Sequence, residues 1–203
     1  HNWITGIRNN QDSISGDIPI ISPRPYIKDE GVEWSSTYIN LIWKYYIYYG
    51  DKRILQENYG AMKKYMAFLD AEAKDHILKQ GWIGDWGSLV KDWKEGEPES
   101  VPTAYYFWNS KILSKIANVL DKKNDVKYFS LKAETIKDAY NKKYFNKEKM
   151  EYNMGSQMAN AFPLYLGIVP DQYKSEVLKN LVDDILHKNN GHLTTGVLGS
   201  KYM

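Results

Sequence analysis

The sequence predicts an all-α domain in which helix hairpins form part of a ring. Three observations lead to this prediction. Charged amphipathic segments alternate with segments nearly free of charge, no stretch shows the sustained alternation of a β-strand, and 203 residues of which 43% are apolar suffice for one core. We therefore expect a single domain over residues 1–203.

Four segments are rich in aromatic or small residues and carry few charges, which indicates helices buried on several sides. We call them inner helices, and each follows a polar turn with Gly, Pro, Ser or Thr, such as "GEPESVPT" and "NNGHLTTG". An extended loop with three prolines, residues 16–26, leads into the first of them. The predicted inner helices are 34–50, 101–120, 156–169 and 192–203.

Three charged segments between them predict outer helices with one solvated face: 51–75, 125–145 and 170–188. In the last, Tyr173, Val177, Leu181 and Ile185 recur at helical spacing. The alternation of inner and outer helices is a repeat of hairpins, which stack into an open solenoid or curl into a ring. Nearly uncharged inner helices favour the ring, and three and a half hairpins would leave a six-hairpin ring incomplete.

The charge pattern excludes several classes of partner. Lys and Arg number 27 against 25 Asp and Glu, and they mix along helix faces, so we expect no nucleic-acid and no membrane partner. The chain has no Cys and four scattered His, so we expect no metal and no cofactor. The sequence does not identify the cellular compartment. The start "HNWITGIRNNQ" has no signal-peptide pattern, but it is also compatible with a leader that has been lost.

Aromatic residues are the informative excess, with 17 Tyr and 7 Trp against 5 Phe. Such side chains suit helix cores with wet ends, and they also suit sugar rings. In a ring of hairpins the loops that enter the inner helices gather at one mouth, where helix N-termini offer free N–H groups. The residues that lead or open the inner helices are Trp34, "GDW" at 84–86, Thr103, Gln157 and His192.

The stretch "GWIGDWGSLV", residues 81–90, places two indoles and a carboxylate among glycines. We expect Trp82 to anchor the loop in the core. Asp85 and Trp86 should face the mouth, with Trp86 as an aromatic plate for a sugar ring and Asp85 as an acceptor for its hydroxyls. Gly84 and Gly87 would permit a tight backbone path. The alternative is that both indoles belong to the core and that Asp85 caps a turn.

Glycoside hydrolysis needs paired carboxylates, and six acids lie in predicted loops on the mouth side. Their spacing singles out no pair. They are Asp29, Glu30, Glu33, Glu95, Glu97 and Glu99.

Six stretches in this order closely resemble bacterial α-L-rhamnosidases of glycoside hydrolase family 78. They cover practically the whole chain, and no single one is decisive. They are 9–23, 31–69, 84–86, 102–145, 155–170 and 191–203. The resemblance implies a partial (α/α)6 toroid and hydrolysis of terminal α-L-rhamnosides with inversion.

The resemblance also implies site residues. Trp34 and Trp86 match aromatic residues that line the rhamnose pocket, Asp85 stands beside them, and His192 lies in a recurrent segment. The family's general acid belongs to an Asp-Glu-Arg-x-x-Trp motif before these stretches and its general base to a Glu after them, so we expect no catalytic residue here. "DEGVEW" at 29–34 mimics the first motif but lacks the Arg, and we interpret Glu30 as a loop acid.

We therefore expect a central fragment of a glycosidase that binds L-rhamnosides and is inactive alone. The alternatives are another toroid glycosidase, a polysaccharide lyase, a carbohydrate-binding module without catalysis, or a helical-repeat scaffold that binds protein partners. A half-ring would expose its last inner helices, so we also expect self-association through the open edge.

Overall fold

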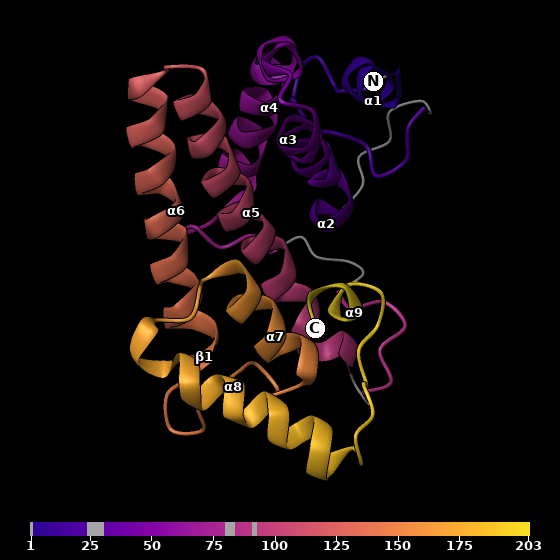
Figure 1. The fold of residues 1–203 in the computed structure, drawn as a ribbon, viewed down its shortest axis with the longest axis vertical. Helices are drawn as coiled ribbons and strands as arrows, with labels where there is room; N and C mark the ends of the chain where they lie inside the picture. The colour runs from indigo at the N-terminus through magenta and orange to yellow at the C-terminus, as the bar shows by residue number, and fades with distance from the viewer. Residues whose placement is uncertain (1, 24–30, 80–83, 91–92) are drawn as a thin grey trace.

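Helices carry the fold in the computed structural model, which describes residues 2–23, 31–79, 84–90 and 93–203 (Figure 1). The helices are α1 (Asn2–Asn9), α2 (Val32–Ser35), α3 (Thr37–Tyr49), α4 (Lys52–Glu72), α5 (Trp93–Val119), α6 (Lys123–Tyr144), α7 (Gln157–Leu166), α8 (Lys174–Asp183) and α9 (Gly199–Tyr202). A short antiparallel pair, β1 (Phe145–Asn146) and β2 (Glu151–Tyr152), joins α6 to α7. The predicted all-α class is confirmed.

Three hairpins follow one another along the chain: α3 with α4, α5 with α6, and α7 with α8 (Figure 1). Local signals set their boundaries. Gly50 ends α3 in the left-handed conformation, and the Asp51 side chain then caps α4 by accepting from the Arg53 N–H. Ser156 caps α7 in the same way by accepting from the Ala159 N–H. These hairpins match the predicted alternation of inner and outer helices.

The inner helices supply the centre of the core. Tyr38 and Ile39 of α3, Tyr106 and Phe107 of α5, and Phe162 of α7 are almost fully buried. The outer helix α6 instead buries one face, spaced three and four residues apart, and leaves its charged face in water. The residues of that buried face are Phe129, Ala133, Ile136, Tyr140 and Tyr144.

One helix was missed by the sequence analysis, and one predicted boundary was wrong. Helix α1 was not predicted, and it buries Ile4 and Ile7 against the core. Helix α5 begins at Trp93, so the predicted turn "GEPESVPT" at 96–103 is helical. Core contacts from Val101 onward outweigh the local cost of proline in a helix, which is about 3 kcal/mol per residue.

The predicted fourth inner helix, 192–203, was also wrong in extent, because only Gly199–Tyr202 is helical. Residues 192–198 run as an extended segment and turn beside α7 (Figure 1). Their backbone N–H and C=O groups bind other parts of the chain instead of each other, as described below.

Over the described stretches, no helix has both the length and the apolar character required to cross a bilayer.

Candidate functional site

Two segments far apart in sequence bind each other side by side, and we call residues 84–90 and 192–199 the loop clamp. The Leu89 N–H donates to the Thr194 carbonyl over 2.9 Å, and the Val197 N–H donates to the Trp86 carbonyl over 2.9 Å. The Ser88 hydroxyl adds a third bond, 3.0 Å to the same Thr194 carbonyl. Gly84 and Gly87 both have positive φ, which confirms the predicted tight backbone path.

Asp85 is the centre of the loop clamp. Its side chain is 0% exposed, and its two oxygens accept from the backbone N–H groups of Gly196 and Gly199, each over 2.7 Å. Gly199 is the first residue of α9, where backbone N–H groups lack helical partners and favour an anion. Asp85 therefore holds the start of α9 from a distant segment, and these two donors satisfy its buried carboxylate. Its expected part in binding a sugar stays a prediction.

Close approach of the two segments requires glycine at two positions. A Cβ on Gly196 would lie 2.3 Å from the Trp86 carbonyl oxygen and 2.4 Å from that of Asp85. A Cβ on Gly199 would lie 2.7 Å from the Asp85 carboxylate. All three distances are below normal van der Waals contact, so any larger residue would push the segments apart.

Gln157, the first residue of α7, ties the inner helix to the loop clamp. Its amide nitrogen donates to the His192 carbonyl over 3.1 Å and to the Asp184 carboxylate over 3.0 Å. Its amide oxygen accepts from the Thr194 N–H over 2.9 Å. Three of the predicted leading positions, 84–86, Gln157 and His192, are thus joined by hydrogen bonds.

Two of the predicted sugar-binding side chains in the loop clamp are open to solvent. The Trp86 indole is 57% exposed, so it does not belong to the core, while its backbone is fixed by Val197. His192 is exposed too, and among the described residues its hydrogen bonds are those of its backbone, to Gln157 and Asn189. The loop clamp thus exposes the Trp86 indole and the His192 imidazole on a backbone that is fixed by hydrogen bonds.

Trp34 lies in α2 and lines a different hollow, a cavity of about 280 Å³ beside α1. Trp3 and Tyr38 line the same cavity, and no residue of the loop clamp does. The Trp34 indole N–H is buried and has no acceptor in the part of the chain that the structure describes. Buried donors without an acceptor are uncommon in folded proteins.

A tyrosine of α5 connects the surroundings of Trp34 with α9. The Tyr105 hydroxyl shares a 2.8 Å hydrogen bond with the Tyr202 hydroxyl of α9. Burial raises the pKa of Tyr105 well above its usual value, the Tyr202 hydroxyl raises it further, and so does the Glu33 carboxylate. Helices α2 and α9 therefore meet the same part of α5, on one side of the molecule (Figure 1).

Glu33 and Tyr105 are polar residues that the sequence analysis did not assign to the site. Glu33, predicted as one loop acid among six, is 3% exposed in the first turn of α2. The only signal for it was its place directly before Trp34. Tyr105 gave no signal, because nothing in its neighbourhood distinguishes it from the other tyrosines of an inner helix.

Other sequence predictions fall elsewhere. Thr103 does not open a helix: it lies inside α5, and its hydroxyl binds both the N–H and the carbonyl of Leu78. Glu95, Glu97 and Glu99 belong to the backbone of α5 rather than to a loop. Trp82, Asp29 and Glu30 lie outside the described residues. Within the described ranges no three His, Cys, Asp or Glu side chains gather as metal ligands would.

Stacked helix hairpins, with an exposed indole and polar groups at the leading turns of the inner helices, define an all-α helix-hairpin domain. Comparison with known families agrees: the family described as the bacterial alpha-L-rhamnosidase 6 hairpin glycosidase domain matches residues 1–203. The chain belongs to this family.

Relatives and solved structures extend the match. The structure of alpha-L-rhamnosidase from Dictyoglumus thermophilum is 36% identical with a TM-score of 0.89, covering 98% of this chain and 23% of that one. The Streptomyces avermitilis enzyme complexed with L-rhamnose has a TM-score of 0.87 at 20% identity, with 98% and 19% covered, which shows the shared fold.

Curated relatives are much longer than this chain. An alpha-L-rhamnosidase of Formosa agariphila is 26% identical over 203 residues, which are 98% of this chain and 22% of the relative. A second one from the same organism is 31% identical over 186 residues, 85% of this chain and 19% of the relative. The chain spans about a fifth of the length of these relatives.

Proposed function

We propose that this chain is the sugar-binding part of an α-L-rhamnosidase that removes terminal α-L-rhamnose from glycosides with inversion. The observation that carries the proposal is the family match over all 203 residues. The likeness to a solved alpha-L-rhamnosidase at 36% identity supports it.

The loop clamp gives the proposal a physical basis. The exposed Trp86 indole offers a flat apolar face for the C–H face of a pyranose, and its backbone is already ordered, so stacking costs little conformational entropy. Asp85 acts as a positioning residue, because its oxygens are occupied by Gly196 and Gly199. His192 supplies a hydrogen-bonding group for a hydroxyl beside this plate, whereas Trp34 belongs to the separate cavity beside α1.

Proton transfer in this proposal comes from carboxylates outside the chain. Inverting hydrolysis needs a general acid and a general base about 6.5–9.5 Å apart, and each contributes about 10²–10⁴ in rate. We therefore expect the 203-residue chain to be inert toward an aryl α-L-rhamnoside. Turnover by the purified chain that a Glu30→Gln variant abolishes would show that the acid lies within it.

Binding tests the sugar site independently of turnover. Titration calorimetry with L-rhamnose should show binding that D-glucose does not match, and Trp86→Ala should weaken it about tenfold or more, the value of a lost aromatic stack. Tyr48→Ala is the matched control, since Tyr48 is an aromatic side chain that is 81% exposed at the far end of α3. Equal effects of the two substitutions would contradict the role of Trp86.

Exposed apolar side chains support a proposal of self-association through the open edge. Leu178, Val182 and Leu186 recur four residues apart and are 52%, 43% and 54% exposed. Leu193 and Val197 of the loop clamp are about half exposed too. Sedimentation velocity should show a concentration-dependent dimer, and Leu178→Gln with Leu186→Gln should reduce it. A sharp monomer at all concentrations would oppose this proposal.

A further inference from the structure

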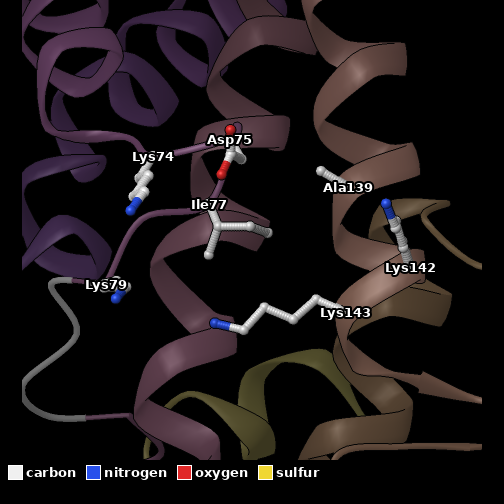
Figure 2. Close-up of a pocket in the computed structure, with 7 residues that line it drawn as sticks. All are labelled: Lys74, Asp75, Ile77, Lys79, Ala139, Lys142 and Lys143. Atoms are coloured by element: carbon white, nitrogen blue, oxygen red, sulfur yellow. The ribbon is translucent and has the colours of Figure 1, made fainter.

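Lysines gather in a cleft remote from the loop clamp. The cleft, about 520 Å³ in volume, lies between the connection from α4 to α5 and the C-terminal half of α6 (Figure 2). No residue of the loop clamp lines it. We call it the lysine cleft, and its lining residues are Lys74, Asp75, Ile77, Lys79, Ala139, Lys142 and Lys143.

The charge of the lysine cleft is unbalanced, with four ammonium groups to one carboxylate. Some lysines elsewhere have acidic partners: Lys63 lies 3.0 Å from Asp125, and Lys132 lies 2.6 Å from Asp70. In contrast, the ammonium groups of Lys74, Lys79 and Lys142 make no hydrogen bond or ion pair with any described residue.

One wall of the lysine cleft is held rigidly. Lys74 and Ile77 exchange two backbone hydrogen bonds of 2.9 Å across a tight turn in which Asp75 and His76 have φ of 51° and 64°. The Thr103 hydroxyl of α5 then holds the backbone of the next residue, Leu78. Lys74 and Lys79 therefore flank an ordered segment, opposite the two lysines of α6 (Figure 2).

Apolar groups line the lysine cleft between the charges, namely Ile77 and Ala139. Low-dielectric walls with charges of one sign concentrate the electric field and attract anions. Part of the charge has a structural role, since Lys142 and Lys143 lie in the last turn of α6 and stabilise its dipole. Lys79 lies in no helix and has no such role.

We propose that the lysine cleft binds a carbohydrate that carries a carboxylate or sulfate group. The ammonium groups bind the oxyanion, and the apolar residues contact the C–H face of the ring. Lysine presents a point charge that does not select one oxyanion geometry, which fits either group. The carbohydrate part rests on the proposed function, whereas the anion part rests on the cleft alone.

Titration calorimetry of the 203-residue chain tests the proposal with four probes: D-glucuronate, D-glucose 6-sulfate, inorganic sulfate and D-glucose. We expect both charged sugars to bind more tightly than sulfate or glucose, and the affinity to fall as NaCl is raised. The double variant Lys79→Gln, Lys142→Gln should weaken both charged sugars about tenfold, while Lys179→Gln on α8, also exposed, should change nothing.

Removal of the single acid gives a test in the opposite direction. Asp75→Asn retains a residue that tolerates the left-handed backbone, and it should raise the affinity for the charged sugars about twofold or more. Absence of binding, or binding that the double variant leaves unchanged, would overturn the proposal. Sulfate that binds as tightly as glucose 6-sulfate would overturn the carbohydrate assignment.

The two proposals fail separately. L-rhamnose binding should be unchanged in the double variant, because the lysine cleft and the loop clamp share no residue. A wild-type chain that binds glucuronate but not L-rhamnose would overturn the proposed function and not the anion site. A chain that binds L-rhamnose but neither charged sugar would do the reverse.

Discussion

Two carboxylates, Asp85 in the loop clamp and Asp125 in the first turn of α6, each accept hydrogen bonds from more than one donor. The Asp85 side chain is fully buried, and its donors are backbone N–H groups more than 100 positions away. The Asp125 side chain is 23% exposed, and its donors are the Tyr59 hydroxyl and the Lys63 ammonium. If Asp85 is removed, the buried backbone N–H groups cannot bind water instead, whereas the Tyr59 and Lys63 side chains can do so if Asp125 is removed. The two aspartates should therefore contribute differently to the free energy of unfolding.

The largest expected effect comes from removing the buried carboxylate. Asp85→Ala leaves the N–H groups of Gly196 and Gly199 buried without an acceptor, and it should reduce the free energy of unfolding by about 3–5 kcal/mol. Urea denaturation followed by circular dichroism measures this. Asp183→Ala is the control, because Asp183 is exposed on α8 and should change stability by less than about 0.5 kcal/mol. Similar urea midpoints for the two variants would show that the buried Asp85 contributes no more to stability than an exposed aspartate.

A methyl group added where residues 192–199 contact residues 84–90 tests the loop clamp without changing any charged side chain. Gly196→Ala should destabilise the protein by about 2–4 kcal/mol, since the new Cβ would collide with the backbone at Trp86. Gly60→Ala, in α4 with nothing within 4 Å, should instead stabilise by about 0.5–1 kcal/mol. If both substitutions changed the free energy of unfolding in the same direction, the close contact of Gly196 with the backbone at Trp86 would be contradicted.

Gln157 sharpens the comparison because it holds the same segment from α7. Gln157→Leu keeps the volume but leaves the Thr194 N–H without its acceptor, and we expect a loss of about 1–3 kcal/mol. Combined with Asp85→Ala, the loss should be smaller than the sum of the single losses, since either substitution releases residues 192–199. Strictly additive unfolding energies would show that the two side chains hold the segment independently.

The smallest effect belongs to Asp125. The Tyr59 hydroxyl and then Lys63 lower its pKa below the value of an unfolded chain, so its contribution is present above about pH 4 and is lost as the pH falls through the folded pKa. Asp125→Asn should cost at most about 1 kcal/mol at pH 7, and the difference should shrink by pH 3. A constant difference between pH 7 and pH 3 would exclude this ionisation as the cause.

Sequence periodicity was sufficient to predict the helices around Asp125. The buried face of α6 follows from residues such as Phe129, Ile136 and Tyr140 at helical spacing, and the charge-poor stretches marked α3 and α7 as inner helices. The start of α5 was missed because prolines at 98 and 102 indicate a turn locally, whereas the core decides. Helix α1 is too short for periodicity to identify.

The loop clamp could be predicted only in part. Proximity of 84–86 to His192 followed from the ring of hairpins, but the buried bonds of Asp85 did not. Glycines in "GHLTTGVLG" are equally compatible with a flexible turn and with a close backbone contact, and only the partner segment distinguishes the two. Exposure of Trp86 likewise depends on what covers it, which no local pattern encodes.

The two segments of the loop clamp are synthesised at different times. Trp86 leaves the ribosome more than a hundred residues before Gly196 and Gly199, so its backbone has no fixed support until those glycines are made and docked. Any ligand that stacks on the Trp86 indole would bind only chains in which the two segments have docked. Such a ligand would shift the population toward them, and its affinity would report on how complete folding is.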